Sequence, residues 1–325
     1  MTEERFRGVR IVTNDLHVSY DSQFALESDG LNLTGNVIAI LGHNGAGKST
    51  LIKALLGLLT PERGRLEVRA TCGDGEAEAV LVPEQDMAFC PETGAVFHDI
   101  KVESYVQLWC RIKHNDGSYY RNEGRRIIER LELEPLLKRL GRELSKGQRR
   151  RVQTAIGFLT RPRLFLFDEP FDGLDVQRSS ELTELIESEI GNMSVLLSSH
   201  RMDVIERLAD AVIVLKEGHI LTSGPLDEVC MTLCGKSLLV HGISAHERAI
   251  EQLRSRYPDA LINRLGAQIS VTGHGPTETD LHRLLAAEFR ESFQIESVRP
   301  SLTDAMNFHL KSVRAAANPT GPIQP

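Results

Sequence analysis

Cysteines and long apolar runs are scarce in this sequence, and each of these two scarcities excludes a class of protein. Aromatic residues make up 5% of the chain, and its five cysteines are scattered and odd in number. Such a set does not predict a disulfide framework. No run reaches the roughly 18–20 apolar residues that span a bilayer, and residues 1–10 are charged without an apolar signal core. We therefore expect a cytoplasmic protein that acts at a membrane only through a partner.

Positive charge is also in deficit. The chain has 38 Lys and Arg against 45 Asp and Glu, which gives a net charge of -7 at pH 7. Binding to nucleic acid without sequence preference requires a basic surface that neutralises phosphates, so we expect no nucleic-acid partner. The 325 residues, 41% of them apolar, are enough for two domains.

The sequence does contain a glycine-rich loop in the context that phosphate binding requires. An apolar run at 37–41 precedes the loop and a helix-prone run at 51–56 follows it. Glycines let successive backbone N–H groups point at phosphate oxygens, and the helix start adds partial positive charge. Lys48 can reach the β- and γ-phosphates, and the Ser49 hydroxyl can bind Mg²⁺. The stretch predicts a nucleoside triphosphate site made of Gly42, His43, Asn44, Gly45, Ala46, Gly47, Lys48, Ser49 and Thr50.

Two carboxylates follow a predicted buried strand farther along the chain. Residues 164–167 are all apolar and lead directly into Asp168 and Glu169, a pattern typical of a parallel strand. Because parallel strands place their carboxyl ends along one edge of a sheet, we expect this pair near the glycine-rich loop. One carboxylate would help to hold Mg²⁺ and the other would address a water molecule. His200, at the end of another predicted strand, could contact the γ-phosphate or that water.

A further motif identifies a family. The stretch Leu144-Ser145-Lys146-Gly147-Gln148 precedes a predicted helix, and Ser145 with Gln148 predicts a capping box at its start. Together with the phosphate loop, the strand ending in Asp168 and Glu169, and His200, this signature resembles the ATP-binding-cassette (ABC) ATPases over about residues 5–230. The resemblance implies an α/β phosphate-loop fold. Its parts are a mostly parallel core sheet, an antiparallel β subdomain, and a helical subdomain at about 96–155.

The resemblance also implies roles for individual residues in a head-to-tail homodimer, or in a pair with a second cassette. ATP and Mg²⁺ held by one copy would be covered by Ser145, Lys146, Gly147 and Gln148 of the other. Glu169 would be the general base, Asp168 would support Mg²⁺, and His200 would sense the γ-phosphate. Asp175 would link the two sites, and Tyr20 resembles the aromatic residue that stacks on adenine.

The sequence departs from the family pattern at two positions. The family usually has Gln in the loop that binds Mg²⁺ and couples to the permease, and here both Gln85 and Glu92 are candidates. We favour Glu92 as the residue that contacts Mg²⁺, because the spacing from Pro91 to Val102 reproduces that of the family. The second departure is Lys146, where the signature commonly has Gly.

The remainder of the chain predicts a small α+β accessory domain at 236–310, with the order βαββαβ of a split βαβ fold, and a disordered tail at 312–325. Residues 299–305 are similar to the C-terminal extension of exporter-type ATPases that pair with a separate permease. We therefore expect an ATP-hydrolysing subunit that drives an exporter through a separate transmembrane permease at the inner face of the membrane. The alternatives are an importer subunit, or a soluble ABC ATPase that acts on ribosomes or DNA.

Overall fold

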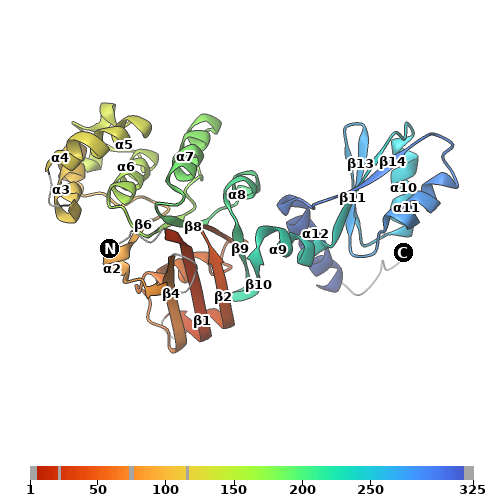
Figure 1. The fold of residues 1–325 in the computed structure, drawn as a ribbon, viewed down its shortest axis with the longest axis horizontal. Coiled ribbons are helices and arrows are strands. Elements are labelled where there is room, and N and C mark those ends of the chain that lie inside the picture. Colours follow the sequence, from red (N-terminus) through yellow and green to blue (C-terminus); the bar gives the residue numbers. More distant parts are fainter. Residues whose placement is uncertain (1–5, 21–22, 73–76, 115–116, 318–325) are drawn as a thin grey trace, which may run out of the picture. The chain divides into compact units, whose positions relative to one another are not determined.

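The computed structural model describes residues 6–20, 23–72, 77–114 and 117–317. The chain forms two compact units, Met1–Pro225 and Leu226–Pro325 (Figure 1). The division falls just before helix α9 (Leu226–Cys234), which packs against α12 (Leu302–Ala317). The second unit therefore includes the whole of α9, whereas the predicted cassette ends at about residue 230, within this helix.

A ten-stranded sheet organises the first unit, in the order β5-β4-β1-β2-β10-β9-β3-β8-β7-β6. Strands β3, β6, β7, β8 and β9 form its parallel part, with β3 between β8 and β9, and β7 between β6 and β8. The strands β3 and β8 are buried along their whole length, as parallel strands covered on both faces must be. The bounds are β3 (Val37–Leu41), β6 (Met87–Cys90), β7 (Leu164–Asp168), β8 (Ser194–Ser198) and β9 (Ala211–Lys216).

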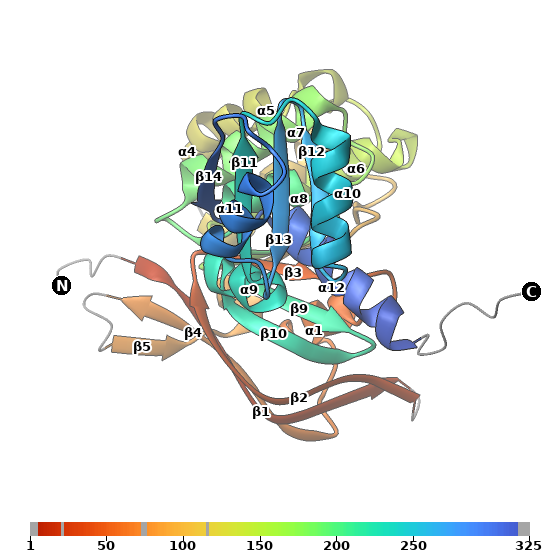
Figure 2. The ribbon, with the colours of Figure 1, turned by 90° about the vertical axis from the view of Figure 1, so that its right-hand side faces the viewer.

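The antiparallel part of this sheet contains a long hairpin. Its strands pair from Val9 with Gly35 to Tyr20 with Gln23, with one irregularity after Val18. Figure 2 shows β1, β2 and β4 running side by side as long strands. The bounds are β1 (Phe6–Tyr20), β2 (Gln23–Gly35), β4 (Arg63–Cys72), β5 (Ala77–Val80) and β10 (His219–Pro225).

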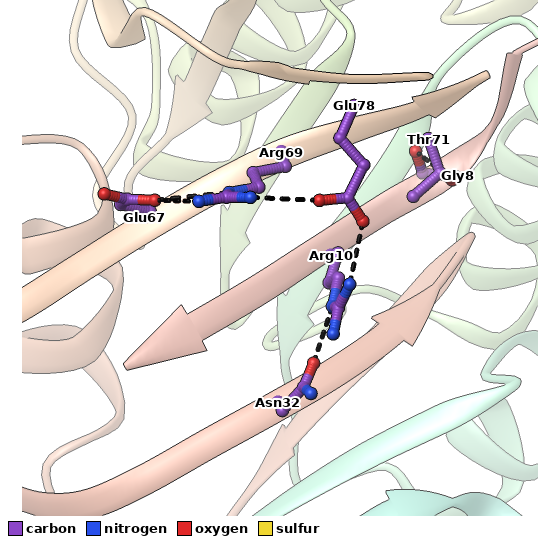
Figure 3. A network of polar contacts seen from close by, with 7 residues as sticks. All are labelled: Gly8, Arg10, Asn32, Glu67, Arg69, Thr71 and Glu78. Atoms are coloured by element: carbon purple, nitrogen blue, oxygen red, sulfur yellow. Dashed lines mark hydrogen bonds and ion pairs between the residues drawn. The ribbon is translucent and has the colours of Figure 1, made fainter. Parts of the chain in front are cut away.

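A network of charged side chains helps to set the register of the antiparallel strands (Figure 3). The Glu78 carboxylate on β5 accepts hydrogen bonds from Arg10 on β1 at 2.9 Å and from Arg69 on β4 at 3.1 Å. Arg10 also donates to Asn32 at 2.6 Å, and Arg69 donates to Glu67 at 2.7 Å. These hydrogen bonds hold the pKa of Glu78 below its usual range. One carboxylate thus joins three strands, so a register slip would separate opposite charges.

The helices of the first unit form two sets. Figure 1 shows α3, α4, α5 and α6 as one group, which is the predicted helical subdomain. Its bounds are α3 (Val102–His114), α4 (Gly117–Tyr119), a π-helical turn (Tyr120–Gly124), α5 (Arg125–Arg130), 3₁₀ turns at Glu134–Leu136 and Gly141–Glu143, and α6 (Lys146–Leu159). The others are α1 (Lys48–Leu55), α2 (Pro83–Asp86), α7 (Val176–Glu189) and α8 (Met202–Leu208). The predicted combination of a largely parallel core, antiparallel strands and a helical group is confirmed.

The second unit has the predicted βαββαβ order. Its four strands are all antiparallel and lie in the order β12-β13-β11-β14. Apolar side chains of α10 and α11 pack with those of β11 and β13 in one buried cluster. The bounds are β11 (Lys236–His241), α10 (His246–Arg256), β12 (Leu261–Leu265), β13 (Gln268–Gly273), α11 (Glu278–Ala286) and β14 (Gln294–Val298).

The end of the chain corrects one prediction. Helix α12 continues to Ala317, so the disordered tail predicted from residue 312 does not begin there. Three alanines at 315–317 explain the extension, because alanine has the highest helix propensity. The rest of the predicted tail, 318–325, lies outside the described residues. Within the described ranges, no helix combines the length and the apolarity needed to cross a bilayer.

Candidate functional site

The glycine-rich loop connects β3 to α1, and several of its glycines have backbone conformations or packing that suit glycine. Gly47 precedes α1 with a φ of 104°, a left-handed conformation that favours glycine, and no side chain caps the helix start. A Cβ on Gly42 would lie 2.6 Å from the Leu215 carbonyl oxygen, so only glycine fits there. A Cβ on Gly45 would meet no atom within 4 Å. The first N–H groups of α1 thus remain available for an anion, as phosphate binding requires.

A cavity of about 590 Å³ lies over this loop. Because β7 lies in the same parallel sheet as β3, its end brings Asp168 and Glu169 to the loop, and Glu92 after β6 joins them. Gln85, the other candidate for the coupling loop, lies in α2 and does not line the cavity. The lining residues are Phe24, Ala25, His43, Asn44, Gly45, Gly47, Lys48, Ser49, Thr50, Glu92, Asp168, Glu169, Glu217 and Gly218.

Lys48 is the cation at the base of this cavity. Its side chain is only 7% exposed, and its Nζ donates to the Gly42 carbonyl at 2.8 Å. The same Nζ lies 3.4 Å from the Glu169 carboxylate. A buried ammonium group needs such partners, because burial without them is strongly unfavourable. Lys48 is therefore held where it can exchange a carboxylate oxygen for a phosphate oxygen.

Glu169 departs from the geometry expected of a strand residue. The strand β7 ends at Asp168, and Glu169 has a φ of 50°, a left-handed conformation that is uncommon for a side chain of this size. The turn lets both carboxylates line the same cavity instead of pointing in opposite directions. The Glu169 carboxylate accepts from the His200 backbone N–H at 3.2 Å and lies 3.0 Å from His200 Nε2. His200 is thus placed beside Glu169, but it is not among the residues that line the cavity.

The two acidic residues are joined by Ser198, which was not among the predicted site residues. Its hydroxyl donates to Asp168 at 2.8 Å and accepts from the Glu169 backbone N–H at 2.9 Å. Ser198 is fully buried and is paired with Asp168 in the register of β7 and β8. The signal available in the sequence was its place at the end of a strand parallel to the one that carries Asp168.

The signature residues do not line this cavity. Ser145 caps α6, accepting from the Gln148 N–H at 3.3 Å, while its own N–H donates to the Gln148 side chain at 3.0 Å. The predicted capping box is therefore confirmed. Gly147 and Lys146 are exposed in the first turn of α6, and a Cβ on Gly147 would meet no atom within 4 Å. In a single chain, Gly147 thus has open space beside it, while Lys146 Nζ lies 2.9 Å from the Glu92 carboxylate.

Asp175 likewise lies away from the cavity. It caps α7 by accepting from the Arg178 N–H at 2.9 Å. Val176, the first residue of that helix, is 81% exposed.

Phe24, rather than Tyr20, is the aromatic residue in the cavity lining. Tyr20 is exposed, with Lys53 Nζ 5.8 Å from the centre of its ring. Phe24 stacks on His219, with ring centroids 5.1 Å apart and planes at 29°. Sequence reasoning missed Phe24, and the only available signal was its position in the same hairpin as Tyr20.

The turn at Glu217 and Gly218 also lines the cavity and was not predicted. The Gly218 N–H donates to the Ala46 carbonyl at 3.0 Å, and the Gly218 carbonyl accepts from Glu27 N–H at 2.7 Å. The turn thereby joins the phosphate loop to the hairpin that carries Phe24. A contact of this kind between distant segments has no local sequence signal.

Arg150 holds the loop that carries Glu92 against α6. The Arg150 side chain is 5% exposed, and its Nε donates to the Glu92 carbonyl at 2.9 Å. It also donates to the Asp172 carbonyl, in the segment between β7 and α7. A Cβ on Gly94 would lie 2.5 Å from the Arg150 backbone nitrogen. Helix α6 therefore holds the backbone of the loop that carries Glu92 and of the segment between β7 and α7, and its first turn carries the signature residues.

The oxygen donors around the cavity fit a magnesium ion. Among the described residues, no cluster of three His, Cys, Asp or Glu side chains could hold a metal on its own. Mg²⁺ is usually held by one or two carboxylates together with phosphates and waters, and it requires no such cluster. Ser49, Asp168 and Glu92 supply a hydroxyl and two carboxylates on the lining. This set suits a cation that enters with a nucleotide.

Comparison with known proteins shows which family the chain belongs to. Residues 31–172 match the family model described as ABC transporter. The molybdenum import ATP-binding protein ModC of Brucella melitensis biotype 1 is 30% identical over 296 residues, which cover 85% of this chain and 79% of the relative. The chain belongs to the ABC transporter family. The matched residues include the glycine-rich loop and both Asp168 and Glu169 on the cavity lining.

Other members of the ABC transporter family cover less of the chain. ModC of Aromatoleum aromaticum is 35% identical over 216 residues, covering 65% of this chain. The chain spans 56% of that relative's length. A solved structure described as the ATP binding subunit of an ABC transporter has 28% identity and a TM-score of 0.59, covering 69% of this chain and 92% of its own.

The names of the relatives bear on the direction of transport. Both curated relatives are named as molybdenum import proteins. The comparisons therefore do not support the exporter role expected from residues 299–305, and the importer alternative fits them better.

Proposed function

We propose that this chain binds and hydrolyses ATP as the cassette subunit of an ABC importer, paired with a second cassette and with a separate transmembrane permease. The observation that carries the proposal is the meeting of Lys48, Asp168 and Glu169 around one cavity over the phosphate loop. Phosphoryl transfer needs a cradle, a cation, a metal site and a positioned nucleophile. The cavity has residues suited to each of these parts.

Each residue has a defined part in the proposed hydrolysis. The N–H groups at the start of α1 and the Lys48 ammonium bind the phosphates. Mg²⁺ held near Ser49, Asp168 and Glu92 would neutralise charge on the phosphate oxygens. Glu169 accepts a proton from the attacking water as the general base. His200 orients that carboxylate through its backbone N–H and its ring, which lies 3.0 Å away.

A second cassette would complete the site. The lining of the cavity in one chain includes no signature residue, while Ser145, Lys146 and Gly147 lie exposed at the start of α6. A helix N-terminus attracts anions, so this one suits the phosphates of a nucleotide bound to another copy. Asp175 and the exposed Val176 would lie at the same interface. The paired arrangement would explain why the signature is exposed and lies outside the cavity lining of its own chain.

The names of the relatives support import rather than export, and molybdenum is the first cargo to test. The experiment places the full chain, its co-purified permease and ATP on the inner face of vesicles. Molybdate uptake into the lumen that requires ATP and is lost with Glu169→Gln is the expected result. Expulsion of a preloaded solute without any ATP-dependent uptake would contradict import. Uptake of other oxyanions but not molybdate would leave the importer assignment standing with a different cargo.

Phe24 is the residue that we expect to stack on the adenine ring. Stacking of a base on an aromatic side chain contributes about 1–3 kcal/mol, so Phe24→Ala should weaken ATP binding by roughly 5- to 150-fold. Tyr20→Ala is the matched comparison, because Tyr20 lies in the same hairpin but outside the cavity lining. Calorimetric titration with ATP measures both affinities. A loss confined to Tyr20→Ala would restore the original assignment of Tyr20.

A further inference from the structure

Three rings from three different strands meet at Phe24, the residue proposed above to stack on adenine. The imidazole of His219, on β10, is nearly parallel to the Phe24 ring, with centroids 5.1 Å apart and planes at 29°. The imidazole of His17, on β1, contacts the same ring at 5.6 Å and 46°. Neither histidine is among the residues that line the cavity. Any effect of these imidazoles on a bound base would therefore pass through Phe24.

The Phe24 ring needs support because it is not buried in the core. Its side chain is 45% exposed, and water alone does not select one of the staggered rotamers. A Cβ on Gly218 would lie 2.7 Å from Phe24 Cε1, so a side chain there would push the ring aside. The backbone of Gly218 thus leaves room for the ring, and His219, the next residue, covers one of its faces.

His219 is itself fixed to the hairpin that carries Phe24. In the sheet it pairs with Glu27 of β2 and with Lys216 of β9. The Gly218 carbonyl, just before it, accepts from the Glu27 N–H at 2.7 Å. The imidazole Nδ1 lies 3.8 Å from the Glu27 carboxylate. The imidazole is therefore placed against Phe24 by a backbone that moves with the hairpin.

We propose that His219 is a positioning residue for the nucleotide base, and that its imidazole holds the Phe24 ring in the orientation whose other face stacks on adenine. The proposal rests on the stacking role proposed above for Phe24. The base would be the third ring of a stack that begins with His219. The role depends on the flat ring of His219 and not on its charge, because the base contacts Phe24 and not the imidazole.

The size of the effect follows from the cost of ordering Phe24. Without His219, the exposed ring is free in the empty chain, and ATP must order it on binding. Losing a contact between two rings, or ordering one side chain, corresponds to roughly 2- to 12-fold in affinity. This loss is smaller than the loss expected for Phe24→Ala, because His219 only keeps the stacking ring in place.

The test titrates the full chain with ATP by calorimetry. His219→Ala should weaken binding by roughly 2- to 12-fold, and so should His219→Gln, which stays polar beside Glu27 but has no ring. His219→Phe should restore the affinity, because it returns a flat ring to this position. Adding His219→Ala to Phe24→Ala should have no further effect. In steady-state hydrolysis, His219→Ala should raise KM for ATP and leave kcat unchanged.

A probe without a base and a matched control separate this role from a merely structural one. Inorganic tripolyphosphate with Mg²⁺ occupies only the phosphate side, so its affinity should be the same in His219→Ala and in the unmodified chain. His282→Ala is the control, because His282 contacts Phe293 in the second unit with centroids 5.0 Å apart and planes at 40°. It removes a contact of the same kind, and ATP affinity should not change.

The outcomes distinguish a failure of this proposal from a failure of the proposed function. If Phe24→Ala weakens ATP binding and His219→Ala does not, the positioning role of His219 is overturned and the stacking role of Phe24 remains. Equal losses for ATP and tripolyphosphate, without rescue by His219→Phe, also overturn the positioning role. Unchanged ATP affinity in both Phe24→Ala and His219→Ala contradicts the stacking role itself. Failure of the unmodified chain to bind ATP contradicts the proposed ATPase function.

Discussion

Glu169→Gln is expected to lower ATP turnover by roughly 10²–10⁴-fold, because a positioned general base contributes about that factor. Gln keeps the shape of the side chain and still accepts a hydrogen bond from the His200 N–H, which now lies 3.2 Å from the carboxylate. It cannot accept a proton from water. ATP binding should therefore persist, and the paired state should accumulate. Phosphate release measures turnover, and equilibrium titration measures binding.

The matched control for this variant is Glu184→Gln, which removes a similar carboxylate from an exposed position on α7. Turnover in the control should stay at the level of the unmodified chain. Near-normal turnover in Glu169→Gln would contradict the role of Glu169 as the base and would direct attention to Asp168 and His200. Loss of ATP binding in Glu169→Gln would indicate instead that the carboxylate supports the loop through Lys48, 3.4 Å away.

Lys48→Ala is also expected to lower ATP hydrolysis strongly, but by weakening the binding of ATP. Its ammonium is nearly buried and close to the cavity, and a hydrogen bond to a charged group contributes about 1.5–3 kcal/mol. ATP affinity should therefore fall by roughly 10- to 150-fold, and hydrolysis should fall with it. Calorimetric titration provides the affinity, and a thermal melt checks that the chain stays folded.

Lys236→Ala serves as the control for Lys48→Ala, because it removes an exposed ammonium from β11 in the second unit. ATP affinity in that variant should be unchanged. If Lys48→Ala binds and hydrolyses ATP normally, the assignment of the phosphate cradle is wrong. The two variants together separate binding from chemistry, since Glu169→Gln is expected to retain ATP and Lys48→Ala is not.

Local patterns in the sequence predicted the parts of the site that depend on short stretches of chain. The glycines of the phosphate loop, the apolar strand before Asp168 and the capping box of Ser145 and Gln148 are each set by neighbouring residues. The direction of parallel strands then predicted that Asp168 and Glu169 would reach the loop at one sheet edge. The order of elements in the second unit followed in the same way from periodicity and turns.

Only the tertiary structure decided which distant side chains share the cavity. The aromatic residue on the cavity lining is Phe24 and not the predicted Tyr20, because the turn at Gly218 brings the hairpin against the phosphate loop. Glu92 rather than Gln85 lines the cavity because Arg150 ties its backbone to α6. The sequence showed Glu92 and Lys146 as two separate departures from a family pattern, and the fold brought them to 2.9 Å. The physical reason is that local conformation depends on adjacent residues, whereas these contacts form between segments far apart in the chain.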